Sequence, residues 1–178
     1  MKKITKVQRI TISSLLASFS ILLSQISRYL SIPGLPMLKF DFSDIPIFVS
    51  TLIFDQFHGY LIILVVSIIK SILFSSVGWM GFIMRMISVV PIFFLNMYNK
   101  KKKNIILYSF LSIMFSLLIK IPMNYILWID FFSMNLDQVN SMMKIILPYN
   151  IIKYIINIYI SVLLSNKLKN IMDKNEKF

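Results

Sequence analysis

The chain has 178 residues, of which 57% are hydrophobic, and a formal net charge of +12. Soluble domains are usually only about 45–50% apolar, so this composition argues against one and indicates a membrane protein. The absence of cysteine excludes disulfides, thiol nucleophiles and thiolate metal sites. The basic residues stand at the ends of apolar segments. We therefore expect them to meet lipid headgroups and do not expect nucleic acid as a partner.

Six apolar segments follow one another, and together they predict one all-α membrane domain, residues 1–178, with six transmembrane helices. The first segment lacks an A-x-A cleavage site and is expected to stay in the protein. The second is short for a crossing and would need a locally thinned bilayer. The expected helices are residues 7–30, 45–57, 60–74, 79–97, 105–129 and 146–168.

The connections carry the turn-forming and polar residues. Residues 31–44 contain prolines, a glycine and charges, which predicts a structured loop. Asp44 is expected to cap the second helix, with Pro46 in its first turn. Residues 130–144 are predicted to form a polar loop, and Pro148 is expected near the start of the last helix.

The basic residues gather in three patches, and an even number of crossings separates each patch from the next. By the positive-inside rule, both termini and the central patch are then cytoplasmic. The loops on the opposite side have charges that nearly cancel. The patches are Lys2, Lys3, Lys6 and Arg9; Lys100, Lys101, Lys102 and Lys103; and Lys167, Lys169, Lys174 and Lys177.

Four basic residues lie within the apolar segments, where an ionisable group is costly and therefore a functional candidate. We expect Arg85 and Lys120 to extend toward the outer interface. Lys70 is deeper, and either a neighbouring carbonyl or a partner could bind it. Lys153 is the fourth.

Asn150 and Lys153 are three residues apart, so they share a face of the last helix. Asn124 follows Pro122 at a similar depth. Two amides and an ammonium offer both donors and acceptors, which suits a neutral heterocycle with an amide edge. Hydrogen bonding between helices is the alternative. Flat apolar walls could come from Phe40, Phe42, Tyr125, Trp128 and Tyr149.

No catalytic motif is present, so an enzyme is not expected. The single histidine, His58, lies in a turn that the topology assigns to the cytoplasmic side. There is no Gly-rich phosphate loop, G-x-S-x-G or H-E-x-x-H. Asp41 and Asp44 have no further ligands nearby, so no metal site is expected.

Three segments carry a resemblance to the S-components of energy-coupling factor (ECF) transporters, above all the riboflavin-specific branch. The loop before the second helix, Leu38-Lys39-Phe40-Asp41-Phe42-Ser43-Asp44-Ile45-Pro46, resembles theirs. Pro122-Met123-Asn124-Tyr125 resembles their fifth-helix asparagine-tyrosine motif. The stretch from Pro148 to Lys153, with Asn150 between, resembles their P-x-N-x-x-K motif.

The resemblance implies a substrate-capture subunit of a vitamin-uptake transporter in the bacterial cell membrane. A vitamin, first of all riboflavin, would bind in an outward-facing pocket covered by the loop after the first helix. In that branch the matching asparagines and lysine contact the ligand. The predicted substrate-binding residues are Asn124, Asn150, Lys153, Phe40, Asp41, Tyr125, Trp128 and Tyr149.

The first helix carries small residues four apart, a spacing that allows close helix packing in lipid. A generic lipid-facing helix is the alternative. The resemblance implies that this stretch contacts the transmembrane T-component and that two ATPase subunits supply the energy, so ATP is used only by those subunits and no cofactor is needed. The predicted partner contacts are Ser13, Ser14, Ala17 and Ser18.

One departure from the riboflavin branch concerns the fourth helix. That branch carries a G-E-x-A-N-like stretch where this chain has Gly78-Trp79-Met80-Gly81-Phe82, so an acid and an asparagine are missing. A different vitamin or heterocycle therefore remains an alternative ligand. A structural membrane subunit without a ligand is a further alternative.

Overall fold

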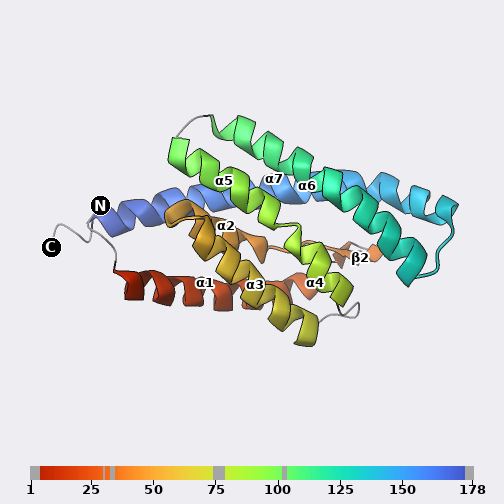
Figure 1. Cartoon of the computed structure of the whole chain (residues 1–178), viewed down its shortest axis with the longest axis horizontal. Helices are drawn as coiled ribbons and strands as arrows, with labels where there is room; N and C mark the ends of the chain where they lie inside the picture. Colours follow the sequence, from red (N-terminus) through yellow and green to blue (C-terminus); the bar gives the residue numbers. More distant parts are fainter. Residues whose placement is uncertain (1–4, 30, 33–34, 74–78, 102–103, 175–178) are drawn as a thin grey trace.

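The computed structural model describes residues 5–29, 31–32, 35–73, 79–101 and 104–174. This part of the chain forms an elongated bundle of helices with one antiparallel β-hairpin (Figure 1). The all-α prediction therefore holds for the long elements, but the predicted loop 31–44 contains two strands. The elements are α1 (Lys6–Ile26), η1 (Ser27–Tyr29), β1 (Ser31–Ile32), β2 (Leu35–Lys39), α2 (Asp44–Ile53), α3 (Gln56–Leu73), α4 (Trp79–Met86), α5 (Val89–Lys101), α6 (Ile105–Ile126), η2 (Leu127–Phe131) and α7 (Leu136–Lys174).

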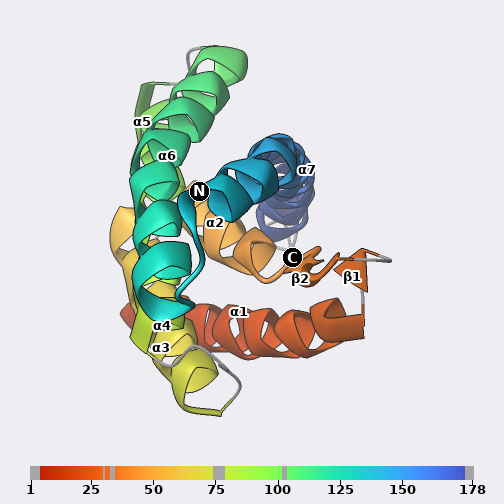
Figure 2. The same ribbon diagram turned by 90° about the vertical axis from the view of Figure 1, so that its right-hand side faces the viewer.

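The centre of the bundle is α2, which the other helices surround (Figure 2). Every residue of this helix is buried, including the polar Ser50 and Thr51. Its 10 residues span only about 15 Å, half of the roughly 30 Å that a crossing requires.

Four helical stretches are long and apolar enough to cross a membrane, whereas α2 and most of α3 form shorter apolar helices. Six crossings therefore stay a prediction. The four stretches are Lys6–Ile26, Gly81–Lys100, Ile105–Phe131 and Leu136–Met172.

The expected helix over residues 79–97 is wrong as a single helix, because it divides into α4 and α5. Pro91 has no N–H to give to the carbonyl of Ile87, so the α-helical ladder loses a hydrogen bond here, and Pro91 lies in the first turn of the new helix. The N–H of Val90 donates to that carbonyl instead, at 3.1 Å. The break places Arg85 in the last turn of α4.

The expected polar loop 130–144 is also wrong over most of its length, because α7 begins at Leu136. Asn135 and Gln138 each accept the other's backbone N–H through their side chains, at 2.9 and 3.2 Å, and this reciprocal pair starts the helix early. Pro148 consequently lies inside α7 and not at its start.

The basic patches lie at one end of the bundle, to the extent that the structure describes them (Figure 1). Lys169 near the end of α7 donates to the side chain of Asn99 in α5 at 3.0 Å, which joins the third patch to the residue before the second. Arg9 of α1 lies 4.0 Å from Asp55 at the same end. The β-hairpin lies toward the opposite end. The three basic patches of the sequence predict that they gather at one end. That this end is cytoplasmic remains a prediction.

Candidate functional site

The site begins with residues 40–44, here called the stem, which join the hairpin to α2. Ser20 of α1 donates a hydrogen bond to the carbonyl of Ser43. Asn157 of α7 donates to the carbonyl of Asp41 at 3.0 Å. The stem is therefore fixed between α1 and α7, on opposite sides of α2.

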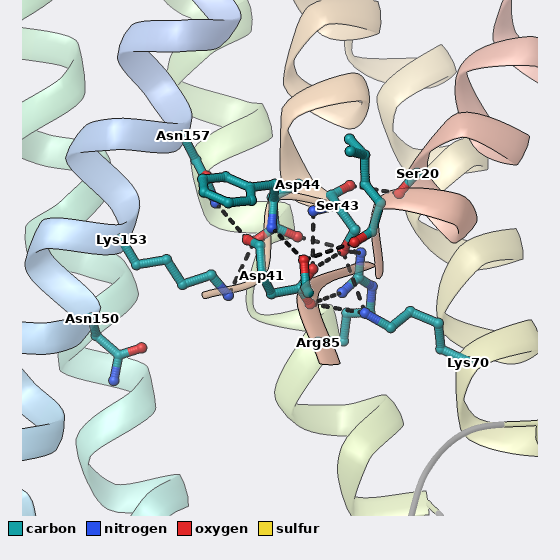
Figure 3. A network of polar contacts seen from close by, with 12 residues as sticks. Ser20, Asp41, Ser43, Asp44, Lys70, Arg85, Asn150, Lys153 and Asn157 are labelled. Carbon is teal, nitrogen blue, oxygen red and sulfur yellow. Dashed lines mark hydrogen bonds and ion pairs between the residues drawn. The ribbon is translucent and has the colours of Figure 1, made fainter. Parts of the chain in front are cut away.

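Five charged side chains converge on the stem and are called the charge network: Asp41, Asp44, Lys70, Arg85 and Lys153 (Figure 3). The Asp41 carboxylate lies 2.8 Å from the Lys70 ammonium and 3.2 Å from the Arg85 guanidinium. The Asp44 carboxylate lies 3.4 Å from Arg85 and 3.7 Å from Lys153. The network thus connects α2 to α3, α4 and α7.

The charge network holds Asp41 in its ionised form. Burial acts to raise the pKa of Asp41, but Lys153, Arg85 and Lys70 outweigh it and hold that pKa well below its ordinary value. Asp41 lies in the stem, outside the apolar helices, and its side chain is one-fifth exposed.

A pH dependence of stability follows from this lowered pKa. Because the folded-state pKa lies below that of the unfolded chain, the stabilisation is complete above the ordinary carboxyl pKa of about 4 and is lost progressively as the pH falls below it. We expect the unfolding temperature in detergent to drop in this acid range, and to drop less for Asp41→Asn. Asp130→Asn, an exposed control, should keep the wild-type profile; equal profiles for all three proteins would contradict the assignment.

The network corrects several expectations. Arg85 and Lys120 both reach partners inside the bundle, so their extension toward the outer interface stays a prediction. Lys70 binds a carboxylate and not a carbonyl. Asp44 is the first residue of α2, and its N-cap is Ser43, whose hydroxyl is bound to Asp41 and Arg85.

Sequence reasoning therefore missed the pairing itself. The available signal was the need of three buried cations for counter-charges, with only Asp41 and Asp44 near enough in the predicted topology. Assigning Asp41 to substrate binding and Asp44 to helix capping concealed it, although Asp44 is only 2% exposed.

Asn150 and Lys153, predicted to bind substrate, share the face of α7 that looks toward the stem (Figure 3). The Asn150 amide donates to the carbonyl of Ile146 at 3.0 Å and accepts from Lys120 at 3.4 Å. Lys153 pairs with Asp44. Both side chains therefore have partners within the chain.

Three other predicted residues have side-chain polar groups without a hydrogen-bond partner among the described residues, and two of these groups are fully buried. The Trp128 indole N–H and the Tyr149 hydroxyl are both unpaired. Asn124 is 6% exposed, and its side chain makes no hydrogen bond within the described ranges. An unpaired buried polar group costs about 1–3 kcal/mol, so such groups usually meet a water or a ligand.

Asn124 and Trp128 are four residues apart, one turn of helix, with Trp128 in the π-helical turn η2 that ends α6. Trp128 packs with Ile146 of α7, and Asn150 binds the carbonyl of that residue. Tyr149 lies against Phe40 of the stem, with ring centroids 5.6 Å apart.

Tyr125 is placed differently from the other aromatic candidates. Its hydroxyl donates to Asn140 of α7 at 2.6 Å, at an exposed position. It therefore joins α6 to α7 near their connection.

The predicted partner-contact residues of α1 fall on two faces. Ser13 and Ala17 are buried inside the bundle, whereas Ser14 and Ser18 are exposed. In this conformation a second protein could reach only the exposed pair.

The fold is that of a helical membrane protein, with four stretches long and apolar enough to cross a membrane. It is similar to a solved structure described as the S component of a bacterial ECF transporter, with a TM-score of 0.77 and 24% identity over 94% of this chain and 99% of that chain. No curated protein matches the sequence.

The family model for the substrate-specific component of ECF transporters matches residues 8–165. The chain therefore belongs to this family. Its members are transport subunits and not enzymes, and membership implies a small-molecule substrate and assembly with T and ATPase subunits.

Proposed function

We propose that this chain captures a flat heterocyclic vitamin for uptake across a bacterial cell membrane, with riboflavin as the first candidate. The proposed site lies where α6, α7 and the stem meet. Its residues are Asn124, Asn150, Lys153, Phe40, Asp41, Tyr125, Trp128 and Tyr149.

The observation that carries this proposal is the group of unpaired polar atoms. The Asn124 amide, the Trp128 N–H and the Tyr149 hydroxyl have no hydrogen-bond partner among the described residues, and the chain belongs to a family of substrate-binding subunits. A heterocycle with an amide or imide edge supplies complementary donors and acceptors, while the aromatic rings offer flat contacts.

The remaining steps of transport require other subunits. We propose that the hairpin end faces outward, that the T-component docks on α1 at Ser14 and Ser18, and that two ATPases drive the reorientation of the bundle. The missing acid and asparagine near the start of α4 keep a vitamin other than riboflavin as the alternative ligand.

Replacing Asn124 by alanine tests the site, because ligand binding should weaken while the stability of the ligand-free protein does not fall. Loss of a neutral hydrogen bond to the ligand, worth about 1 kcal/mol, should weaken riboflavin binding about fivefold. Because the Asn124 side chain makes no hydrogen bond to the described residues, removing the amide should leave the stability of the ligand-free protein nearly unchanged. Flavin fluorescence quenching in detergent and thermal unfolding measure the two effects.

Asn157→Ala is the matched control, because that amide binds the carbonyl of Asp41. It should lower stability clearly. If Asn124→Ala also destabilised the protein and no vitamin in a panel bound to the wild type, the purely structural alternative would be favoured.

A further inference from the structure

Cations outnumber carboxylates inside the bundle. The charge network holds three basic side chains and two acidic ones. Lys120 of α6 adds a fourth cation through its contact with Asn150. This part of the protein therefore carries an excess of two positive charges, which is costly in a medium of low dielectric constant.

The positive charge of Lys120 is only partly compensated by its neighbours. Its ammonium is 3.4 Å from the Asn150 side-chain oxygen and 4.7 Å from the centre of the Tyr154 ring. No acidic side chain of the described residues lies within ion-pair distance. An ammonium has three donors, so a hydrogen bond to one amide and a cation–π contact leave it able to bind an anion.

The positions of its neighbours define where that anion would lie. Asn150 contacts Lys120 directly and shares a face of α7 with Lys153, one turn further along. Lys153 makes the longest ion pair of the network, at 3.7 Å. Two ammonium groups thus flank one amide at the contact between α6 and α7.

We propose that the ligand of this protein carries an anionic group, a carboxylate or a phosphate, which Lys120 binds beside Asn150. This inference rests on the proposed function and narrows its substrate class: it favours a vitamin with a carboxylate or phosphate, such as riboflavin 5′-phosphate, over riboflavin itself, which has no anionic group. The anion neutralises part of the positive excess and provides the buried ammonium with a charge-assisted hydrogen bond.

Matched pairs of ligands that differ in one anionic group test the proposal. Riboflavin is compared with riboflavin 5′-phosphate, pantothenol with pantothenate, and biotinamide with biotin, on the purified protein in detergent. For the pair that binds, we expect the anionic member to bind on the order of tenfold more tightly. Equal or weaker binding of the anionic member would overturn the inference.

Variants of Lys120 then test whether this side chain causes the preference for the anionic ligand. Lys120→Met should abolish the preference, whereas Lys120→Arg should largely preserve it. Lys144→Met, at an exposed position of α7, is the control and should behave as the wild type. A Lys120→Met protein that lost affinity for both members of a pair equally would contradict an anion-binding role.

A probe without a vitamin separates the two proposals. Inorganic phosphate, compared with chloride at equal ionic strength, should raise the unfolding temperature of the wild type more than that of Lys120→Met. If no ligand pair binds but phosphate has this effect, the vitamin proposal fails and the anion site stands. If phosphate stabilises both proteins equally and no pair binds, both proposals fail.

Discussion

Replacing Asp44 by asparagine is expected to lower the free energy of unfolding by about 3–5 kcal/mol, because it removes one partner of a buried ion pair. The substitution leaves Lys153 without a carboxylate and leaves Asp41 as the only acid for the remaining cations of the charge network. The excess of buried positive charge therefore grows. Equilibrium unfolding in mixed micelles measures the change.

Asp55→Asn is the matched control for this substitution. Asp55 pairs with Arg9 at 4.0 Å and with His58 at 2.8 Å, and its side chain is more than one-third exposed. Asparagine can still accept the hydrogen bonds from His58, so the loss should stay below about 1 kcal/mol. Adding Lys153→Met to Asp44→Asn removes the orphaned charge and should restore part of the stability. An Asp44→Asn protein as stable as Asp55→Asn would show that the network is not energetically coupled.

Replacing Gly59 by alanine is expected to cost about 1–3 kcal/mol, since it overpacks the contact between α2 and α3. A Cβ at this position would overlap the Thr51 hydroxyl and would lie 3.1 Å from a methyl carbon of Ile92. The higher helix propensity of alanine, worth about 1 kcal/mol, offsets only part of this cost. Thermal and denaturant unfolding measure the net loss.

The Thr51→Ala background provides the rescue, because it removes the hydroxyl that the new methyl would meet. In that background Gly59→Ala should cost much less than in the wild type. Gly81→Ala, at a partly exposed position in α4, controls for the general effect of the substitution. A Gly59→Ala protein that unfolds like the wild type would contradict the close approach of the two helices.

The sequence allowed the long apolar helices to be predicted because apolar length is a local property. The expected helix 105–129 corresponds closely to α6 and η2. The predictions failed where polar residues that belong to a helix were assigned to a loop. Residues 136–144 of α7 are polar because they lie near the bundle end, and the Asn135–Gln138 pair starts the helix there.

The charge network could not be derived from local patterns, because its partners come from distant parts of the chain. Lys70 and Asp41 are 29 residues apart, and Arg85 and Asp41 are 44 apart. Only the packing of α3 and α4 around α2 brings them together. Asn150 and Lys153 could be singled out from helical spacing alone, whereas their partners Lys120 and Asp44 required the fold.

The attachment of the stem limits how the hairpin can move. Besides its bonds to Ser20 and Asn157, the stem is fixed by the backbone N–H of Phe42, which donates to the Ser27 hydroxyl. If the hairpin moved together with residues 40–42, these hydrogen bonds and the ion pairs of Asp41 would break. If only the residues before Phe40 moved, these hydrogen bonds and ion pairs would stay intact. The aspartates of the charge network would thus keep their partners even if the strands changed position.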